Sequence, residues 1–157
     1  MAMGFAAKII ATFGWTGFFP FAPATFACVV FCAIYWFVPG GEWLVHPVVA
    51  AVTLVVSVPV SSYMERDYGE DPGCVVIDEV VGMQVVLVAA AGVSAAGLVV
   101  AFFLFRVFDI IKPWPANRSQ DWPRGWGIVA DDVFAAVYTR LVLIGLSLIW
   151  PGLGSFI

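Results

Sequence analysis

The stretch Val75–Gly82 reads VVIDEVVG and places two adjacent carboxylates, Asp78 and Glu79, inside an apolar run. Only 11% of the 157 residues are charged, so acids set among valines are not needed for solubility. An ionised carboxylate away from water is costly unless it is paired or bound to a cation. The first question is therefore which other residues join these two acids.

The composition is typical of a small helical membrane protein. Hydrophobic residues make up 62% of the chain, and the mean hydropathy is +1.00. The net charge of −4 is small, and no basic patch with interleaved aromatic residues favours nucleic-acid binding. The three cysteines lack the spacing of a zinc site. We expect one all-α domain over residues 1–157, a multi-pass transmembrane bundle.

Apolar segments bounded by proline, glycine or charged residues predict about five short spanning helices, with four as the alternative. A mildly amphipathic N-terminal segment, 1–12, is expected to form a helix on the membrane surface. Proline and glycine predict loops over residues 13–23 and 112–127. The predicted spanning helices are residues 24–38, 47–64, 78–91, 95–110 and 131–150.

Alternating these helices across the membrane gathers the basic residues on one side, which the positive-inside rule makes cytoplasmic. These residues are Lys8, Arg66, Arg106, Lys112, Arg118 and Arg124. The same threading brings acids from separate segments to that end of the bundle, namely Glu65, Asp67, Asp71, Asp78, Glu79, Asp109, Asp131 and Asp132.

Converging carboxylates repel one another unless a hard cation neutralises them, and oxygen-only ligands favour Mg²⁺ or Mn²⁺. The cations beside the acids fit a phosphate ligand. We expect Mg²⁺ to be bound by Asp78, Glu79, Asp131 and Asp132, with Asp109 and Glu65 as further candidates. The predicted substrate-binding residues are Thr25, Arg106, Lys112 and Arg118, and the predicted catalytic residues are Asp78, Glu79, Asp132 and Lys112.

Several phosphatase mechanisms lack their residues in this chain. The single histidine, His46, falls on the opposite side from the acids, which disfavours histidine chemistry. No cysteine is followed six residues later by arginine, and no Asp-x-Asp motif supplies an aspartyl nucleophile. A Gly-rich phosphate loop is also absent from the sequence. Metal-assisted hydrolysis of a phosphate ester remains.

Four motifs occur in order: APAT at Ala22–Thr25, DPGCVVIDEVVG at Asp71–Gly82, FRVFDIIKPWP at Phe105–Pro115 and GIVADD at Gly127–Asp132. With them the chain resembles the phosphatidylglycerophosphatase A family from Phe13 to the last helix. The resemblance implies Mg²⁺-dependent conversion of phosphatidylglycerophosphate, a membrane lipid, to phosphatidylglycerol in phospholipid synthesis. It also implies a bacterial inner-membrane location, and the threading places the active site on the cytoplasmic face. Alanine stands at Ala24, Ala27 and Ala136, where the family usually has glycine.

Two other functions remain as alternatives. A membrane phosphotransferase that joins alcohols to a nucleotide-activated lipid also uses acids and Mg²⁺, but its acids lie largely within one long motif. An ion or proton transporter would place its carboxylates near the middle of the bilayer, often within internal repeats. Here the acids come from separate motifs, are expected at one membrane face, and no repeat is visible.

Simpler interpretations of individual residues also stay open. Asp78 and Glu79 are acids that a helix dipole favours in a first turn, and the Asp131–Asp132 pair allows the same interpretation. Asp109 lies three residues from both Arg106 and Lys112 and could be only an ion-pair partner of one of them. Arg140 either pairs with a buried acid or extends its charged group to the membrane surface.

Overall fold

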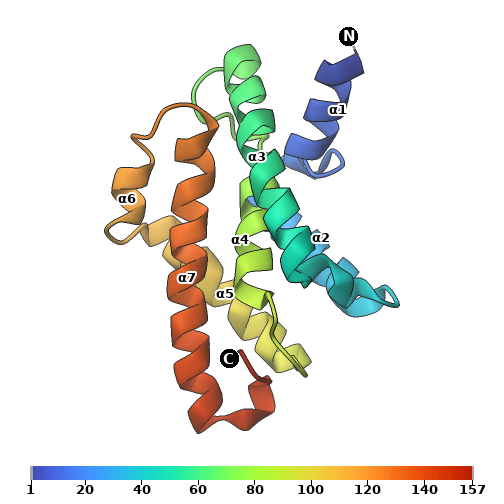
Figure 1. The fold of residues 1–157 in the computed structure, drawn as a ribbon, viewed down its shortest axis with the longest axis vertical. Helices are drawn as coiled ribbons and strands as arrows, with labels where there is room; N and C mark the ends of the chain where they lie inside the picture. The colour runs from blue at the N-terminus through green and yellow to red at the C-terminus, as the bar shows by residue number, and fades with distance from the viewer. Residues whose placement is uncertain (1, 157) are drawn as a thin grey trace.

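The computed structural model describes residues 2–156 and is built from helices, shown in Figure 1. Within this range no β-strand occurs, and the only bridge joins Ala91 to Ser155. The predicted all-α class is therefore confirmed. The helices are α1 (Ala2–Ala11), α2 (Pro23–Phe37), α3 (Pro47–Tyr68), α4 (Ile77–Leu87), α5 (Ala95–Ile111), α6 (Ala116–Ser119) and α7 (Gly125–Ile149), with short 3-10 turns η1 (Thr16–Phe18), η2 (Gly41–Val45) and η3 (Pro151–Leu153).

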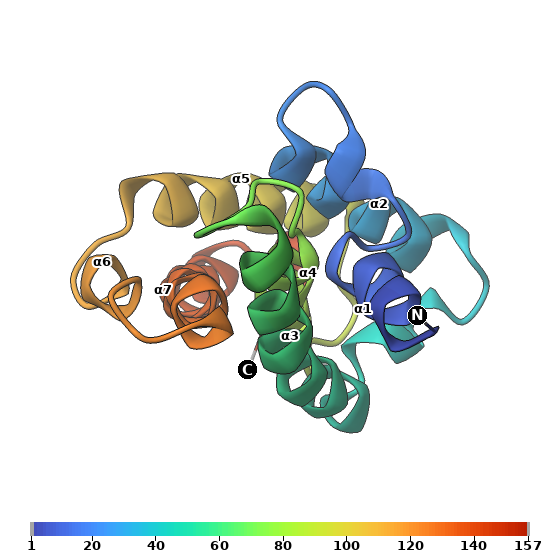
Figure 2. The ribbon, with the colours of Figure 1, turned by 90° about the horizontal axis from the view of Figure 1, so that it is seen from above.

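Helix α4 lies at the centre of the bundle, in contact with α2, α3, α5 and α7 (Figure 2). Ten of its 11 residues are buried, with only Val85 partly exposed. A helix that is apolar on every side is stable only when other helices cover all of it, which explains why the valine-rich run occupies the centre. Gly82 allows the ring of Phe105 on α5 to lie directly against the α4 backbone.

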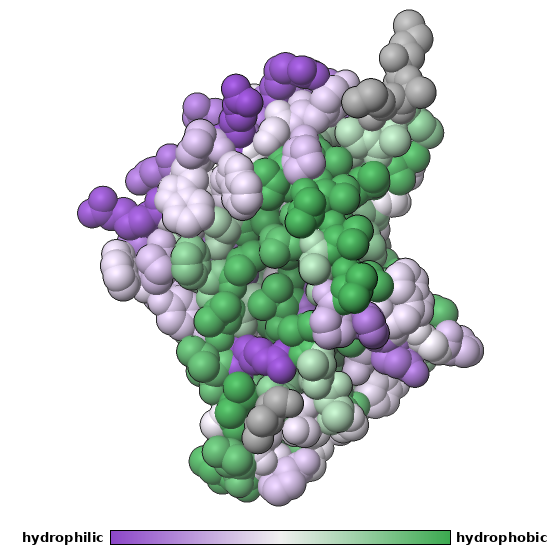
Figure 3. Space-filling model, in the orientation of Figure 1, coloured by the Kyte–Doolittle hydropathy of each residue, from purple (hydrophilic) through white to green (hydrophobic). Residues whose placement is uncertain are grey.

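Two helices, α3 and α7, are long and apolar enough to cross a membrane, and α2 is a shorter apolar helix. Helix α4 has 11 residues and is about 16 Å long, which is about half the thickness of a bilayer core. Hydrophilic residues gather at the upper end of the molecule, where α3 ends and α7 begins, above a hydrophobic middle (Figure 3). These features favour membrane association, while the number of spans stays a prediction.

The prediction that residues 112–127 form a loop is wrong in part. Helix α6 lies inside this segment, and α7 begins at Gly125 rather than at Asp131. Without a side chain, Gly125 packs against α3, where a Cβ would collide with the carbonyl of Val58. Its N–H donates to the Ser62 hydroxyl at 3.0 Å. Asp131 consequently lies in the second turn of α7, so the helix-start interpretation of the Asp131–Asp132 pair is also wrong.

Helix α4 is shorter than its predicted 78–91 range and ends at Leu87. The backbone turns through a left-handed conformation at Ala89, with φ of 56°. The Arg140 guanidinium on α7 donates to the carbonyls of Val86 at 3.3 Å and Val88. Arg140 therefore binds the carboxyl end of a helix, a role that neither of the two expectations for it included.

The other helix boundaries agree more closely with the predicted ranges. Helix α2 starts and ends one residue before the predicted range, α3 continues four residues past 64, and α5 ends one residue past 110. The N-terminal segment forms α1, with Met1 outside the described residues, and η1 lies inside the predicted 13–23 loop. The helix interiors could be located from the apolar pattern because proline or glycine lies near most of their ends.

Candidate active site

The segment that leads into α4 is fixed by contacts with the N-terminal segment and by a turn of its own. The Val76 N–H donates to the Ala11 carbonyl at the end of α1, at 2.9 Å, and the Val75 N–H donates to the Pro72 carbonyl at 2.8 Å. Gly17 packs against the Cys74 carbonyl so closely that a Cβ there would collide with it. The segment before α4 is thus held on both sides, and Asp78 and Glu79 enter the bundle in a defined place.

Three buried carboxylates meet at this place. Asp78, Glu79 and Asp132 each offer one oxygen, and these oxygens lie within 4.8 Å of one another. None of the three residues is more than 8% exposed. Asp78 Oδ1, Glu79 Oε2 and Asp132 Oδ2 have no hydrogen-bond partner. We call these residues the carboxylate cluster. A first-turn cap would not explain three unpartnered oxygens, whereas a bound cation would offset their repulsion and desolvation.

Two further acids are paired with cations. Asp131 Oδ2 accepts from the Lys112 ammonium, and its Oδ1 accepts from the Asp132 N–H at 3.0 Å. Arg106 and Asp109 form a salt bridge of 2.8 Å within α5. The structure therefore contains the ion pair of Asp109 with Arg106, and a role of Asp109 in metal binding stays a prediction. Asp131 and Asp109 differ from the carboxylate cluster because a protein cation already balances each of them.

A pocket of about 340 Å³, which we call the candidate pocket, opens over the carboxylate cluster. Asp109, Lys112 and Asp131 also line it, so the paired and unpaired acids face the same space. The start of α2 contributes Pro23 and Ala24, where a helix N-terminus offers free N–H groups to an anion. The other lining residues are Asp71, Gly73, Val75, Ile110 and Ile128.

Lys112 occupies a turn that the sequence favours. Pro113 disfavours a helical conformation for the residue before it, so α5 ends at Ile111 and Lys112 adopts a left-handed conformation with φ of 46°. Burial lowers the pKa of Lys112, but the hydrogen bond that Lys112 donates to Asp131 and the negative charges of Asp131 and Asp109 raise it more. The pKa of Lys112 therefore lies above its usual value, and the ammonium stays charged at neutral pH.

Other predicted site residues lie outside the candidate pocket. Glu65 lines an adjoining pocket of about 410 Å³, which shares Asp71, Ile128 and Asp131 with the first. Thr25, Arg106 and Arg118 line neither pocket, and Arg118 is exposed. The functional roles of Glu65 and of these three residues stay predictions.

Asp71 is the charged residue in both pockets that the sequence-based site did not include. The sequence signal was the motif Asp71–Gly73, which reads equally well as a turn. Asp71 does adopt a turn conformation, with φ of 42°, and it is exposed. Asp71 therefore both forms a turn and lines the two pockets.

Comparison with known proteins places the chain in a family. Residues 9–147 match the family described as phosphatidylglycerophosphatase A. The chain belongs to the phosphatidylglycerophosphatase A family. This confirms the sequence-based family assignment and, with it, the assignment to a class of phosphoric monoester hydrolases.

Three relatives match this chain, two of them over most of its length. A Bacteroides thetaiotaomicron protein, provisionally named a phosphatidylinositol-3-phosphatase, is 33% identical over 147 residues, covering 88% of this chain and 92% of the relative. Phosphatidylglycerophosphatase A of Escherichia coli is 28% identical over 138 residues, covering 87% of this chain and 80% of its own. The Haemophilus influenzae enzyme of that name is 42% identical over 78 residues, 49% of this chain and 48% of its own. No solved structure matches the chain.

Proposed function

We propose that this protein hydrolyses the terminal phosphomonoester of phosphatidylglycerophosphate to give phosphatidylglycerol and phosphate, and that the reaction needs Mg²⁺. Family membership supports the substrate, because two relatives carry the name phosphatidylglycerophosphatase A. The metal requirement is supported by one structural observation, the three unpartnered buried oxygens of the carboxylate cluster.

The residues present fit Mg²⁺. The carboxylate cluster would hold the ion, since all its donors are carboxylate oxygens, which Mg²⁺ prefers over nitrogen or sulfur. When bound, Mg²⁺ polarises a phosphoryl group and lowers the pKa of water at the site. The cluster lies inside the candidate pocket, so a phosphate that enters the pocket approaches these oxygens.

The other residues of the pocket bind and orient the phosphate. Lys112 donates one N–H to Asp131, and its remaining N–H groups are free for phosphate oxygens. Asp131 orients Lys112, and the free N–H groups at the start of α2 add donors on the Ala24 side. During hydrolysis a water oxygen forms the new bond to phosphorus. The bond from phosphorus to the glycerol oxygen breaks, and that oxygen takes up a proton.

The location supports a lipid substrate. The candidate pocket lies where α2, α4 and α7 begin and α5 ends. Figure 3 shows hydrophilic residues at the upper end of the molecule and apolar surface below them. A lipid whose headgroup reaches this level keeps its acyl chains beside the hydrophobic helices. We propose that this end faces the cytoplasm of a bacterial inner membrane, because Arg66, Lys112, Arg118 and Arg124 lie there.

The test is phosphate release by the purified full-length chain from phosphatidylglycerophosphate in mixed micelles, with Mg²⁺ or with EDTA. We expect release only with Mg²⁺, and its loss in a folded Asp78→Asn variant. Release that is equal with EDTA, or full activity of Asp78→Asn, would contradict the proposal. Nucleotide release from a nucleotide-activated lipid would instead support a phosphotransferase.

The substrate is tested in parallel. One relative is provisionally named for phosphatidylinositol 3-phosphate, so the same assay is run on that lipid. We expect kcat/KM to be higher for phosphatidylglycerophosphate. A higher kcat/KM for phosphatidylinositol 3-phosphate would overturn the proposed substrate while leaving the phosphatase chemistry in place.

A further inference from the structure

We propose that an apolar groove between α2 and α5 binds an acyl chain of the lipid substrate. This inference rests on the proposed function, because it takes the substrate to be a membrane lipid. The groove has a volume of about 270 Å³ and is lined by Val29 and Cys32 of α2 and by Leu98, Val99, Phe102 and Phe103 of α5. Every lining side chain is apolar or a thiol, so the groove suits a hydrocarbon chain rather than a headgroup.

The groove and the candidate pocket lie between the same two helices. Helix α2 begins at the pocket with Pro23 and Ala24, and α5 ends there with Asp109 and Ile110. Both helices then lead away from the pocket, α2 forward along the chain and α5 backward, and the groove lies farther along both of them. A single ligand can therefore follow the α2–α5 interface from the polar pocket into the apolar groove.

The spacing suits the substrate. At 1.5 Å per residue, Val29 lies about 8 Å along α2 from Ala24, and Phe103 lies about 9 Å along α5 from Asp109. In phosphatidylglycerophosphate the terminal phosphate is separated from the acyl chains by a glycerol, a phosphodiester and a second glycerol. With the terminal phosphate in the candidate pocket, that linkage bridges the gap and an acyl chain begins at the level of the groove.

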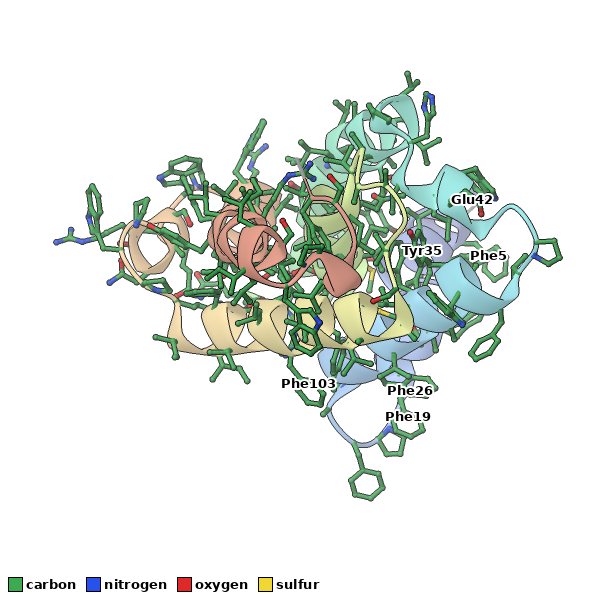
Figure 4. The ribbon with its side chains drawn as sticks, turned by 90° about the horizontal axis from the view of Figure 1, so that it is seen from below. Phe5, Phe19, Phe26, Tyr35, Glu42 and Phe103 are labelled. Atoms are coloured by element: carbon green, nitrogen blue, oxygen red, sulfur yellow. The ribbon has the colours of Figure 1, made fainter. Side chains whose placement is uncertain are left out.

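The groove is open to the outside of the bundle. Val29 is 47% exposed, Val99 53% and Phe103 61%. Figure 4 shows Phe19, Phe26 and Phe103 on the same side of the molecule, and the rings of Phe19 and Phe26 stack with centroids 4.0 Å apart. An aromatic surface thus lies between the start of α2 and the groove, so a lipid can enter sideways from the membrane.

A second apolar hollow, between α3 and α7, fits this role less well. It is smaller, about 180 Å³, and none of its lining residues belongs to the candidate pocket. Trp122 connects it only to the adjoining pocket. A phosphate at the carboxylate cluster would therefore not lead its acyl chain there.

The first test fills the groove with a larger side chain. Val29→Trp and Val99→Trp change exposed positions, so the fold should tolerate them, and Val52→Trp on α3 is the matched control with 57% exposure. Each variant is assayed on dioleoyl and on dihexanoyl phosphatidylglycerophosphate. We expect the long-chain to short-chain ratio of kcat/KM to fall about tenfold or more in the two groove variants and to stay at the wild-type value in Val52→Trp. An unchanged ratio in both folded groove variants would overturn the proposal.

The second test does not depend on hydrolysis. The wild-type chain in vesicles is photolysed with phosphatidylglycerophosphate that carries a diazirine in one acyl chain. We expect crosslinks in residues 29–32 and 98–103 that excess unlabelled phosphatidylglycerophosphate removes and phosphatidylcholine does not. Crosslinks elsewhere, or equal competition by both lipids, would overturn the proposal that the groove binds an acyl chain of the substrate. If neither chain length releases phosphate, the proposed function fails, and the crosslinks still decide whether the groove holds a lipid chain.

Discussion

At the scale of single residues, the acids of the site divide by whether the protein itself balances their charge. Asp109 and Asp131 have cationic partners, and the three acids of the carboxylate cluster have unpartnered oxygens. These five side chains line one pocket, with the same chemistry and similar burial. Removing a charge should therefore have opposite effects on stability in the two groups.

Asp132→Asn should stabilise the metal-free protein while destroying its activity. One negative charge leaves a buried group of three, so we expect the free energy of unfolding with EDTA to rise by about 1 kcal/mol. Phosphate release should fall at least about 100-fold, more than the loss of a supporting residue usually costs. Thermal unfolding in detergent and the phosphate assay measure the two effects.

Asp109→Asn is the matched comparison, and we expect the reverse effect on stability. It leaves the half-buried guanidinium of Arg106 without its partner, and breaking such a pair costs about 3 kcal/mol. A fall in unfolding temperature for Asp132→Asn in EDTA, equal to that of Asp109→Asn, would show that the carboxylate cluster is an ordinary hydrogen-bonded core instead of a cation site.

Mg²⁺ should stabilise the wild-type chain through the same residues. At a concentration of 100 times Kd, a ligand that binds only the folded state adds about 2.7 kcal/mol to the free energy of unfolding. We expect a rise in unfolding temperature with added Mg²⁺ that saturates in the wild type and is absent in Asp132→Asn. The same rise in both proteins would place the ion elsewhere, and no rise in the wild type would refute the Mg²⁺ site.

At the scale of elements, the sequence predicted the interiors of the helices more accurately than their ends. Apolar runs and nearby prolines locate the interiors of α2, α3 and α5. The early end of α4 depends on Arg140, more than 50 residues away along the chain, so no local pattern contains it. The early start of α7 depends on Gly125 packing against α3, whereas glycine in isolation predicts a break.

The same limit applies to the site. Repulsion between acids and the alternation of helices predicted that they gather at one end. Which acids remain unpaired could not be predicted, because Lys112 reaches Asp131 only through the turn after α5 and the register of α7. The sequence also could not predict which pocket an acid lines. Glu65 lies at the predicted end of the bundle but in the adjoining pocket, away from the carboxylate cluster.

Gly82→Ala should separate α4 from α5. The added methyl group would collide with the fully buried ring of Phe105, and overpacking of this kind costs about 1–3 kcal/mol. Gly145→Ala on α7 is the control, because open space surrounds that position and alanine favours a helix by up to about 1 kcal/mol. Unfolding in denaturant measures both variants.

A second substitution tests the cause of the Gly82 effect. Phe105→Leu should recover part of the stability lost in Gly82→Ala, giving a non-additive double mutant. If the losses of the two single variants simply add, contact between the two side chains is not what makes Gly82→Ala unstable.

Arg140→Met should loosen the carboxyl end of α4. It removes donors to half-buried carbonyls, including those of Val86 and Val88, and we expect a loss of about 2 kcal/mol. Arg140→Lys should lose less, because an ammonium can still serve some of these carbonyls. Hydrogen exchange should accelerate over residues 84–91. Asp78 lies about 15 Å along α4 from Val88, so Mg²⁺ affinity should be unaffected, and a large fall in it would contradict a purely local role.

At the scale of the whole molecule, polar and apolar functions are arranged along one direction. The candidate pocket lies where α2 begins and α5 ends, and the α2–α5 groove lies farther along the same two helices. The opposite end carries η2 with Glu42, which Figure 4 shows near Tyr35, so acids are not restricted to the site end. The basic residues distinguish the two ends better than the acids do, and this distinction predicts the orientation in the membrane.

The orientation can be measured with two single cysteines in a variant whose native cysteines, Cys28, Cys32 and Cys74, are replaced by alanine. Asn117→Cys changes an exposed position of α6 at the site end, and Glu42→Cys changes an exposed position of η2 at the other. In intact bacterial cells, a membrane-impermeant maleimide should label Glu42→Cys at once and Asn117→Cys only after permeabilisation. The reverse pattern would place the active site outside the cytoplasm. Labelling of both in intact cells would place both ends outside the cytoplasm. This result would contradict the prediction that an odd number of helices crosses the membrane between residues 42 and 117.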